Sequence, residues 1–200
     1  MTDTYKTIVS PSKGVLLKEK NSKFFGYTFP ITTEEDVKKN LELLKAEHPA
    51  AGHFCYAFQL GTTKKHYRTN DDGEPNNSAG LPIYGQIQSY GVTNTLVVIV
   101  RIYGGTKLGV GGLISAYKTA AQMALENSDI VERTIAIYFQ INFDYKNMNK
   151  VMRIIKEKNL EIVSQKMDET CEILFSTRKK NAEMIVDIFE NLFEIEIKKI

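Results

Sequence analysis

The sequence predicts an α+β protein of two domains, with residues 1–130 in the first and residues 131–200 in the second. Two observations lead to this prediction. From residue 135 onward, strand-like and helix-like segments follow one another in the order β-α-β-β-α-β. Before that point, strand-like and helix-like segments are separated by two polar or glycine-rich loops. We therefore expect two separate folds, joined near residue 130.

Hydrophobic periodicity defines each element of the second domain. Apolar and polar residues alternate as in strands over residues 135–143, 160–166, 170–177 and 193–200. Two segments carry apolar residues at helical spacing, residues 146–158 and 179–191. Their expected buried residues are Met148, Val151, Met152 and Ile155, and then Ala182, Ile185, Val186 and Phe189. The order predicts a ferredoxin-like, four-stranded antiparallel sheet with both helices on one face.

The first domain is predicted to contain a hairpin, three helices and two further strands. The hairpin turns at Asn21–Ser22, and a capping box of Thr32 and Glu35 begins a helix that ends before Pro49. Residues 53–60 form a strand, and residues 61–80 form a long polar loop. The remaining elements are a short helix at 81–91, a buried strand at 94–103 and a helix of about fifteen residues around 113–124.

A glycine-rich segment, RIYGGTKLGVGGLISAY at residues 101–117, lies between the buried strand and the last of these helices. Gly104, Gly105 and Gly109 are expected to adopt positive φ angles, and Gly111 with Gly112 to admit another backbone or a ligand. The first N–H groups of the helix, which have no partner within it, should then face outward.

Positive charge surrounds this segment. Arg101, Lys107 and Lys118 are cations, and residues 75–125 contain no Asp or Glu. Anions are favoured at a helix start in such surroundings, and an arginine can bind phosphate through two hydrogen bonds. The segment matches neither G-x-x-x-x-G-K-[ST] nor G-x-G-x-x-G. Two interpretations stay open, an anion-binding site or glycines that serve only tight packing and a sharp turn.

Other candidate site residues are weaker. Asp71, Asp72 and Glu74 offer enough oxygen atoms for Mg²⁺, although Asp-Gly and Glu-Pro are also ordinary turn sequences. His53 and Cys55 lie on the same face of one strand, where a half-buried structural pair is favoured over a Cys–His nucleophile. No metal site is predicted there, because zinc needs further ligands.

Composition excludes several classes of protein. The formal net charge is +2, from 26 Lys and Arg against 24 Asp and Glu, and both domains are nearly balanced, unlike a dedicated nucleic-acid-binding domain. The chain has neither a signal peptide pattern nor an apolar run of about 18 residues. Cys55 and Cys171 lie far apart without a partner motif, which predicts reduced thiols in a cytoplasmic protein.

Four stretches occur in a family-specific order and spacing: SKFFGY, HFCYAFQLG, NDDGEPNNSAGLPI and RIYGGTKLGVGGLISAYKTAA. They resemble the IMPACT family, in particular its bacterial YigZ-type branch, over residues from about 14 to 130. Ile102 stands where an aromatic residue is usual, and Asn76–Asn77–Ser78 replaces the commoner Ser-Gly-Thr. Neither change removes a charged group.

The resemblance implies a fold and a broad role. The first domain is expected to be similar to the second domain of a ribosomal small-subunit protein, and the second to the last domain of elongation factor G. Eukaryotic relatives are linked to translational control, through competition for the activator of a kinase that senses amino-acid starvation. These similarities favour RNA or the ribosome as the target, although one fold can serve many functions.

Three hypotheses follow for the function. The favoured one is a non-enzymatic cytoplasmic factor without a cofactor, which binds RNA phosphate, a nucleotide or a ribosome-associated protein. Its expected ligand-binding residues are Arg101, Gly104, Gly105, Lys107, Gly109, Gly111, Gly112, Asp71, Asp72, Glu74 and His53. The first alternative is an Mg²⁺-dependent enzyme acting on a phosphorylated small molecule, and the second is a protein-interaction module. No oligomeric state is predicted.

Overall fold

The computed structural model describes residues 3–200, which divide into two compact units. One unit comprises residues 5–133, and the other comprises residues 134–200 together with Asp3 and Thr4. Both units combine a β-sheet with helices, and the second has the ferredoxin-like strand order, so the predicted fold class is confirmed.

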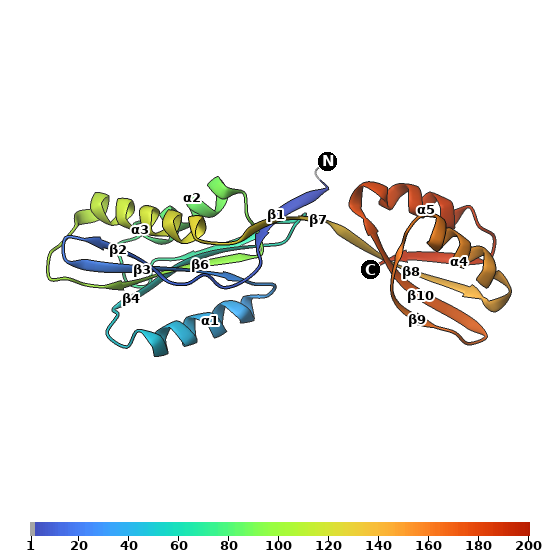
Figure 1. The fold of residues 1–200 in the computed structure, drawn as a ribbon, viewed down its shortest axis with the longest axis horizontal. Coiled ribbons are helices and arrows are strands. Elements are labelled where there is room, and N and C mark those ends of the chain that lie inside the picture. The colour runs from blue at the N-terminus through green and yellow to red at the C-terminus, as the bar shows by residue number, and fades with distance from the viewer. Residues whose placement is uncertain (1–2) are drawn as a thin grey trace. The chain divides into compact units, whose positions relative to one another are not determined.

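The first unit is built on a five-stranded antiparallel sheet in the order β2-β3-β6-β4-β5. The strands are β2 (Val15–Glu19), β3 (Ser22–Pro30), β4 (His53–Leu60), β5 (His66–Asn70) and β6 (Thr95–Ile102). One face is covered by α1 (Glu34–Glu47), and the other by α2 (Gly80–Tyr90) and α3 (Gly109–Glu126) (Figure 1). Two strands that the sequence did not predict, β1 (Thr4–Ile8) and β7 (Ile130–Thr134), form a separate two-stranded sheet.

Strand β6 is buried on both faces, as its uniformly apolar sequence predicted. Leu96, Val98 and Val100 pack in the cluster beneath α1, whereas Val97 and Ile99 pack in the cluster beneath α2 and α3. Successive side chains of a strand point to opposite faces, so the next residue of the second row is Arg101. Its side chain is only 5% exposed. A charged residue therefore enters the apolar layer under α3.

Two local predictions are displaced by one residue. The hairpin turns at Lys20 and Asn21, both with positive φ angles of 45° and 66°, and Ser22 already begins β3. The capping box is formed by Thr33 and Asp36 rather than by Thr32 and Glu35. The Asp36 carboxylate accepts hydrogen bonds from the backbone N–H groups of both Thr32 and Thr33, at 2.9 Å each. Adjacent Thr and acidic residues make the two registers hard to distinguish from sequence.

Two predictions about loops are also corrected. The polar stretch 61–80 contains the edge strand β5, whose first three residues are exposed, and a strand lying in water has no apolar row to identify it. Helix α3 begins at Gly109, so Gly111 and Gly112 lie inside the helix rather than in the loop. The helix is therefore 18 residues long.

The second unit has the predicted sheet, in the order β11-β8-β10-β9 and antiparallel throughout. Its elements are β8 (Ala136–Asp144), α4 (Met148–Glu157), β9 (Glu161–Lys166), β10 (Thr170–Arg178), α5 (Ala182–Glu190) and β11 (Ile195–Lys199). Short 3₁₀ turns, Tyr145–Asn147 and Lys179–Asn181, lead into the two helices. Both helices pack on the same apolar layer of the sheet. Met152 is exposed, contrary to prediction, because Ile154 takes its place in that layer.

The capping box of α1 provides a stability test. We expect Thr33→Ala to lower the free energy of unfolding of the first unit by about 1 kcal/mol, because the helix loses its side-chain cap. Thr32→Ala is the matched control. Its hydroxyl only donates to the Asp36 carboxylate at 3.2 Å and accepts from no N–H group of the helix, so its loss should cost clearly less. Urea denaturation followed by circular dichroism measures both values. A larger loss for Thr32→Ala would place the cap one residue earlier.

Candidate functional site

A buried ion pair between Arg101 and Glu74 lies at the centre of the candidate site. Arg101 Nη1 donates a hydrogen bond to Glu74 Oε1, and Tyr117 Oη donates to the same oxygen atom at 2.7 Å. Arg101 Nη2 lies 3.4 Å from Ser22 Oγ. The glycine-rich segment itself lies in a stretch without Asp or Glu, residues 75–125. Glu74, just outside that stretch, nevertheless reaches Arg101 and neutralises it.

Strands of the sheet, one loop and one helix position these side chains. Arg101 is paired across the sheet with Phe24 of β3 and His53 of β4, and its guanidinium carbon lies 5.4 Å from the ring centre of Phe24. Glu74 comes from the loop between β5 and α2, and Tyr117 comes from α3. The ion pair thus ties the end of the central strand to the loop and the helix above it.

A pocket of about 470 Å³ opens beside the ion pair. Its lining residues are His53, Glu74, Pro75, Arg101, Tyr103, Lys107, Leu108, Gly109, Val110 and Leu113. Of the residues predicted to bind a ligand, the structure thus brings His53, Glu74, Arg101, Lys107 and Gly109 to one pocket. Their role in binding stays a prediction.

The other glycines of the segment lie elsewhere. Gly104 packs on the β2–β3 turn, where a Cβ atom would lie 2.1 Å from the carbonyl of Asn21. It therefore allows the two backbone segments to approach closely, and it does not have the predicted positive φ angle. Gly105 and Gly109 do have positive φ angles, of 86° and 73°. Gly111 and Gly112 are part of α3 and do not line the pocket.

The start of α3 forms one wall of the pocket. No side chain caps this helix at Leu108, and its first turn contains no acidic residue. Lys107 is exposed immediately before it, and within residues 3–200 no ion pair involves Lys107. The start of the helix and one cation thus line the same pocket, and both attract negative charge.

The carboxylates of Asp71 and Asp72 are used by the backbone. Asp71 accepts hydrogen bonds from the N–H groups of Asn77, Ala79 and Gly80 at 2.8–2.9 Å, which shapes the start of α2. Asp72 accepts one from Phe54 N at 2.6 Å. In the described part of the chain, no three His, Cys, Asp or Glu side chains are placed to hold a metal ion. The three acidic residues therefore do not assemble as the Mg²⁺ hypothesis requires.

Cys55 and His53 have separate surroundings although they share a strand face. The Cys55 thiol lies 3.0 Å from the Asp71 carbonyl and 3.3 Å from Tyr117 Oη, whereas His53 Nδ1 donates to the Asp72 carbonyl at 2.8 Å. Burial raises the pKa of Cys55, and nearby carboxylates raise it further, despite the hydrogen bond to Tyr117. Burial likewise raises the pKa of Tyr117, together with Cys55 and Glu74. These surroundings therefore disfavour the thiolate that a Cys–His nucleophile needs.

Sequence reasoning missed several residues of the site. Tyr117 was assigned only to the apolar stripe of its helix. A signal was available, because a buried tyrosine hydroxyl usually needs a polar partner. Ser22, Tyr103 and Val110 carried no such signal, because their roles depend on the contact of the hairpin turn and the helix start with the end of β6.

Comparisons with known proteins identify the family of this chain. The model of the Impact N-terminal domain matches residues 20–125, more than half of the chain, including every pocket residue. The chain belongs to the IMPACT family. An IMPACT family member of Haemophilus influenzae is 33% identical over 180 residues, covering 86% of each chain. The IMPACT family member YigZ of Escherichia coli is 30% identical over 155 residues, covering 68% of this chain and 76% of YigZ.

The fold of this IMPACT family member also occurs in a solved structure. A crystal structure of a hypothetical protein aligns with all of this chain and 98% of its own, with a TM-score of 0.73 and 24% sequence identity. The similarity shows a shared two-domain fold. Among residues 3–200, no helix has the length and apolar character needed to cross a membrane.

The ion pair predicts a sharp difference in stability between two charge-removing variants. Glu74→Ala should lower the free energy of unfolding by about 3–5 kcal/mol, because it leaves Arg101 buried without a counter-charge. Lys107→Ala should change it by less than about 0.5 kcal/mol, because that side chain is exposed. Urea denaturation of both variants checks this, and equal losses would mean that Arg101 reaches water.

Because both thiols are buried, we expect them to react slowly with thiol reagents in the native protein. At pH 8, native protein should react very slowly with a thiolate-selective reagent such as DTNB, because both Cys55 and Cys171 are free but buried and burial raises the pKa of Cys55. After unfolding in guanidinium chloride, two thiols should react quickly. Rapid reaction of Cys55 in the native Cys171→Ser variant would contradict its protonated, inaccessible state.

Proposed function

We propose that this chain is a non-enzymatic cytoplasmic factor linked to translation, and that its pocket binds a phosphate group of RNA or of a nucleotide. The observation that carries the proposal is the start of α3. An 18-residue helix begins there without a side-chain cap, directly after the exposed Lys107, on the wall of a pocket. A phosphate placed there would accept hydrogen bonds from backbone N–H groups and meet the positive end of the helix dipole.

Charge in the pocket supports this choice. Glu74 balances Arg101, so Lys107 supplies the uncompensated positive charge of the lining residues. Arg101 also has a buried Nε atom without a hydrogen-bond partner in the part of the chain that the structure describes. This unpartnered donor belongs to a residue that lines the pocket.

Apolar surface beside the cation favours a nucleotide unit over a bare phosphate. Tyr103 is 50% exposed and Val110 is 53% exposed, and both line the pocket. The Tyr103 ring already stacks near Arg101, 5.4 Å from its guanidinium carbon. Aromatic side chains of this kind bind RNA bases by stacking, largely independently of sequence.

Two observations argue against the enzyme alternative. The carboxylates that would hold a metal are bonded to backbone N–H groups or to Arg101 and Tyr117. The Cys55 thiol next to Tyr117 is buried, and burial raises its pKa, which disfavours the nucleophilic thiolate. The link to translation rests on membership in the IMPACT family, whose eukaryotic members are connected with translational control.

Phosphate binding predicts a salt-dependent interaction that Lys107 supports. Titration of fluorescent single-stranded RNA should give an affinity that falls with salt, with a logarithmic slope of about −0.7 per phosphate contact. Lys107→Ala should weaken binding and reduce the slope by about one contact. Lys118→Ala is the matched control, because it removes the same charge from an exposed site on α3 outside the pocket, and it should leave the slope unchanged.

Parallel titrations with ATP, GTP and inorganic phosphate separate the possible sources of the phosphate group. Tighter binding of RNA than of free nucleotides would support a role on RNA, and the reverse would support a nucleotide-binding factor. If none of these anions binds, or if both lysine variants bind like wild type, the proposal fails and the pocket residues serve only the fold.

A further inference from the structure

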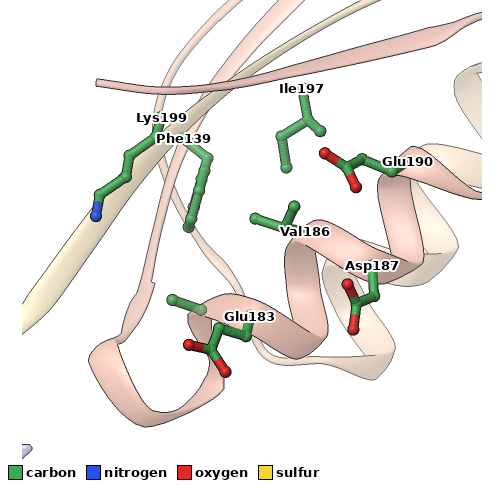
Figure 2. A pocket seen from close by; sticks show the side chains of 8 residues that line it. Phe139, Glu183, Val186, Asp187, Glu190, Ile197 and Lys199 are labelled. Carbon is green, nitrogen blue, oxygen red and sulfur yellow. The ribbon is translucent and has the colours of Figure 1, made fainter.

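A second pocket, of about 370 Å³, lies in the ferredoxin-like unit between helix α5 and edge strand β11. Its floor is apolar. Phe139 of β8, Val186 of α5 and Ile197 of β11 line it, and Figure 2 shows Val186 and Ile197 on its two walls. Although Phe139 belongs to the core, Val186 and Ile197 are only partly buried. Apolar surface is therefore available beside the open edge of a sheet.

One wall of this pocket is acidic. Glu183, Asp187 and Glu190 recur along α5 at helical spacing and are all exposed (Figure 2). Within residues 3–200, no ion pair involves any of the three. Lys199 is the single cation among the lining residues. The groove therefore carries net negative charge next to an apolar floor.

The neighbouring strand edge is open. In the described sheet, β11 pairs only with β8. Ile200 N donates to Tyr138 O at 3.0 Å. In an antiparallel pair only every second residue of a strand bonds to the neighbouring strand, so this bond determines which residues of β11 face β8. The N–H and C=O groups of Ile195, Ile197 and Lys199 therefore point away from β8, toward the open edge. Their side chains lie on the α5 side, where Ile197 and Lys199 line the groove.

The opposite edge of the same sheet is different. Strand β9 has a shift of register against β10 between Leu174 and Phe175. Such bulges twist an edge and discourage further pairing. Strand β11 pairs with β8 in one continuous register. Of the two edges, β11 is the regular one, and it alone has the acidic groove beside it.

We propose that this groove binds an extended segment of another protein that carries both apolar residues and lysine or arginine at alternate positions, on one side of the strand. The segment pairs with β11 as an added strand, through the outward N–H and C=O groups of Ile197 and Lys199. On the side that faces α5, its apolar side chains cover Val186 and Ile197, and its basic side chains reach the carboxylates of α5, because alternate residues of a strand share one face. Backbone pairing provides affinity, and the acidic wall selects the charge of the segment.

Charge decides between this occupant and two others. Antiparallel pairing of β11 with a second copy of itself would bring both α5 helices to the same face of the joined sheet, with their acidic rows side by side. Repulsion between like charges opposes that arrangement. The same carboxylates repel the phosphates of RNA. A cationic protein segment is the occupant that complements the groove.

A titration followed by NMR tests the proposal with the full-length, ¹⁵N-labelled chain. The probe is a short, acetylated and amidated peptide in which every second residue is threonine and the positions between are valine and lysine in turn, so that valine and lysine share one face. It is added at concentrations up to roughly 1 mM, which detects weak binding. We expect shifts in the amide signals of Ile197 and Lys199 and along α5, weaker at high salt. The matched control peptide has glutamate in place of lysine and should not bind.

Two sets of variants locate the interaction. Glu183→Gln, Asp187→Asn and Glu190→Gln in combination should lower the affinity by roughly tenfold, from three exposed charge pairs. The matched control combines Asp168→Asn, Glu169→Gln and Glu172→Gln, which change the net charge equally in the same unit but outside the groove. Ile197→Pro removes an outward N–H group without touching the bonds to β8 and should abolish binding, and Lys199→Pro serves if the first variant does not fold.

Several outcomes would overturn the proposal. These are no shifts at the highest peptide concentration, shifts confined to other surfaces, equal binding of the glutamate peptide, or equal losses in both triple variants. Concentration-dependent shifts at β11 in the absence of peptide would instead show pairing between two copies. Shifts at β11 on addition of single-stranded RNA would show that the groove accepts a polyanion.

Discussion

The buried ion pair between Arg101 and Glu74 joins three segments at the end of the central strand of the first unit. Strand β6 contributes the arginine, the polar loop after β5 contributes the carboxylate, and α3 contributes the Tyr117 hydroxyl. A buried charge is tolerated only with a partner and further hydrogen bonds. The geometry of the loop follows from this requirement, because the carboxylates of Asp71 and Asp72 hold its backbone so that Glu74 reaches inward.

The ion pair also determines which charges remain for other molecules. Arg101 is neutralised, so the free positive charge of the first pocket comes from Lys107 and from the start of α3. In the second unit, the exposed acidic row of α5 gives the groove beside β11 the opposite sign. A net charge of only +2 therefore conceals two local surfaces of opposite charge, since net charge averages over separate sites.

Differences between the sequence predictions and the structure have local physical causes. The hairpin turn and the helix cap are each displaced by one residue, because neighbouring residues can make similar turns and caps. Strand β5 was missed because an edge strand in water needs no apolar row. Met152 was placed in the core because it fits the helical stripe as well as Ile154, and only the position of α4 on the sheet distinguishes them.

The sequence by itself determined the family, the two-domain α+β fold and most helices and strands, because periodicity and signature motifs are local properties. It also indicated two loops as the place of a site. Only the tertiary structure decided that Glu74 neutralises Arg101, 27 residues further along the chain, and that Gly111 and Gly112 belong to a helix. It alone placed the acidic row of α5 beside an open strand edge. Pairing between distant side chains depends on how the elements pack, and spacing along the chain does not encode that packing.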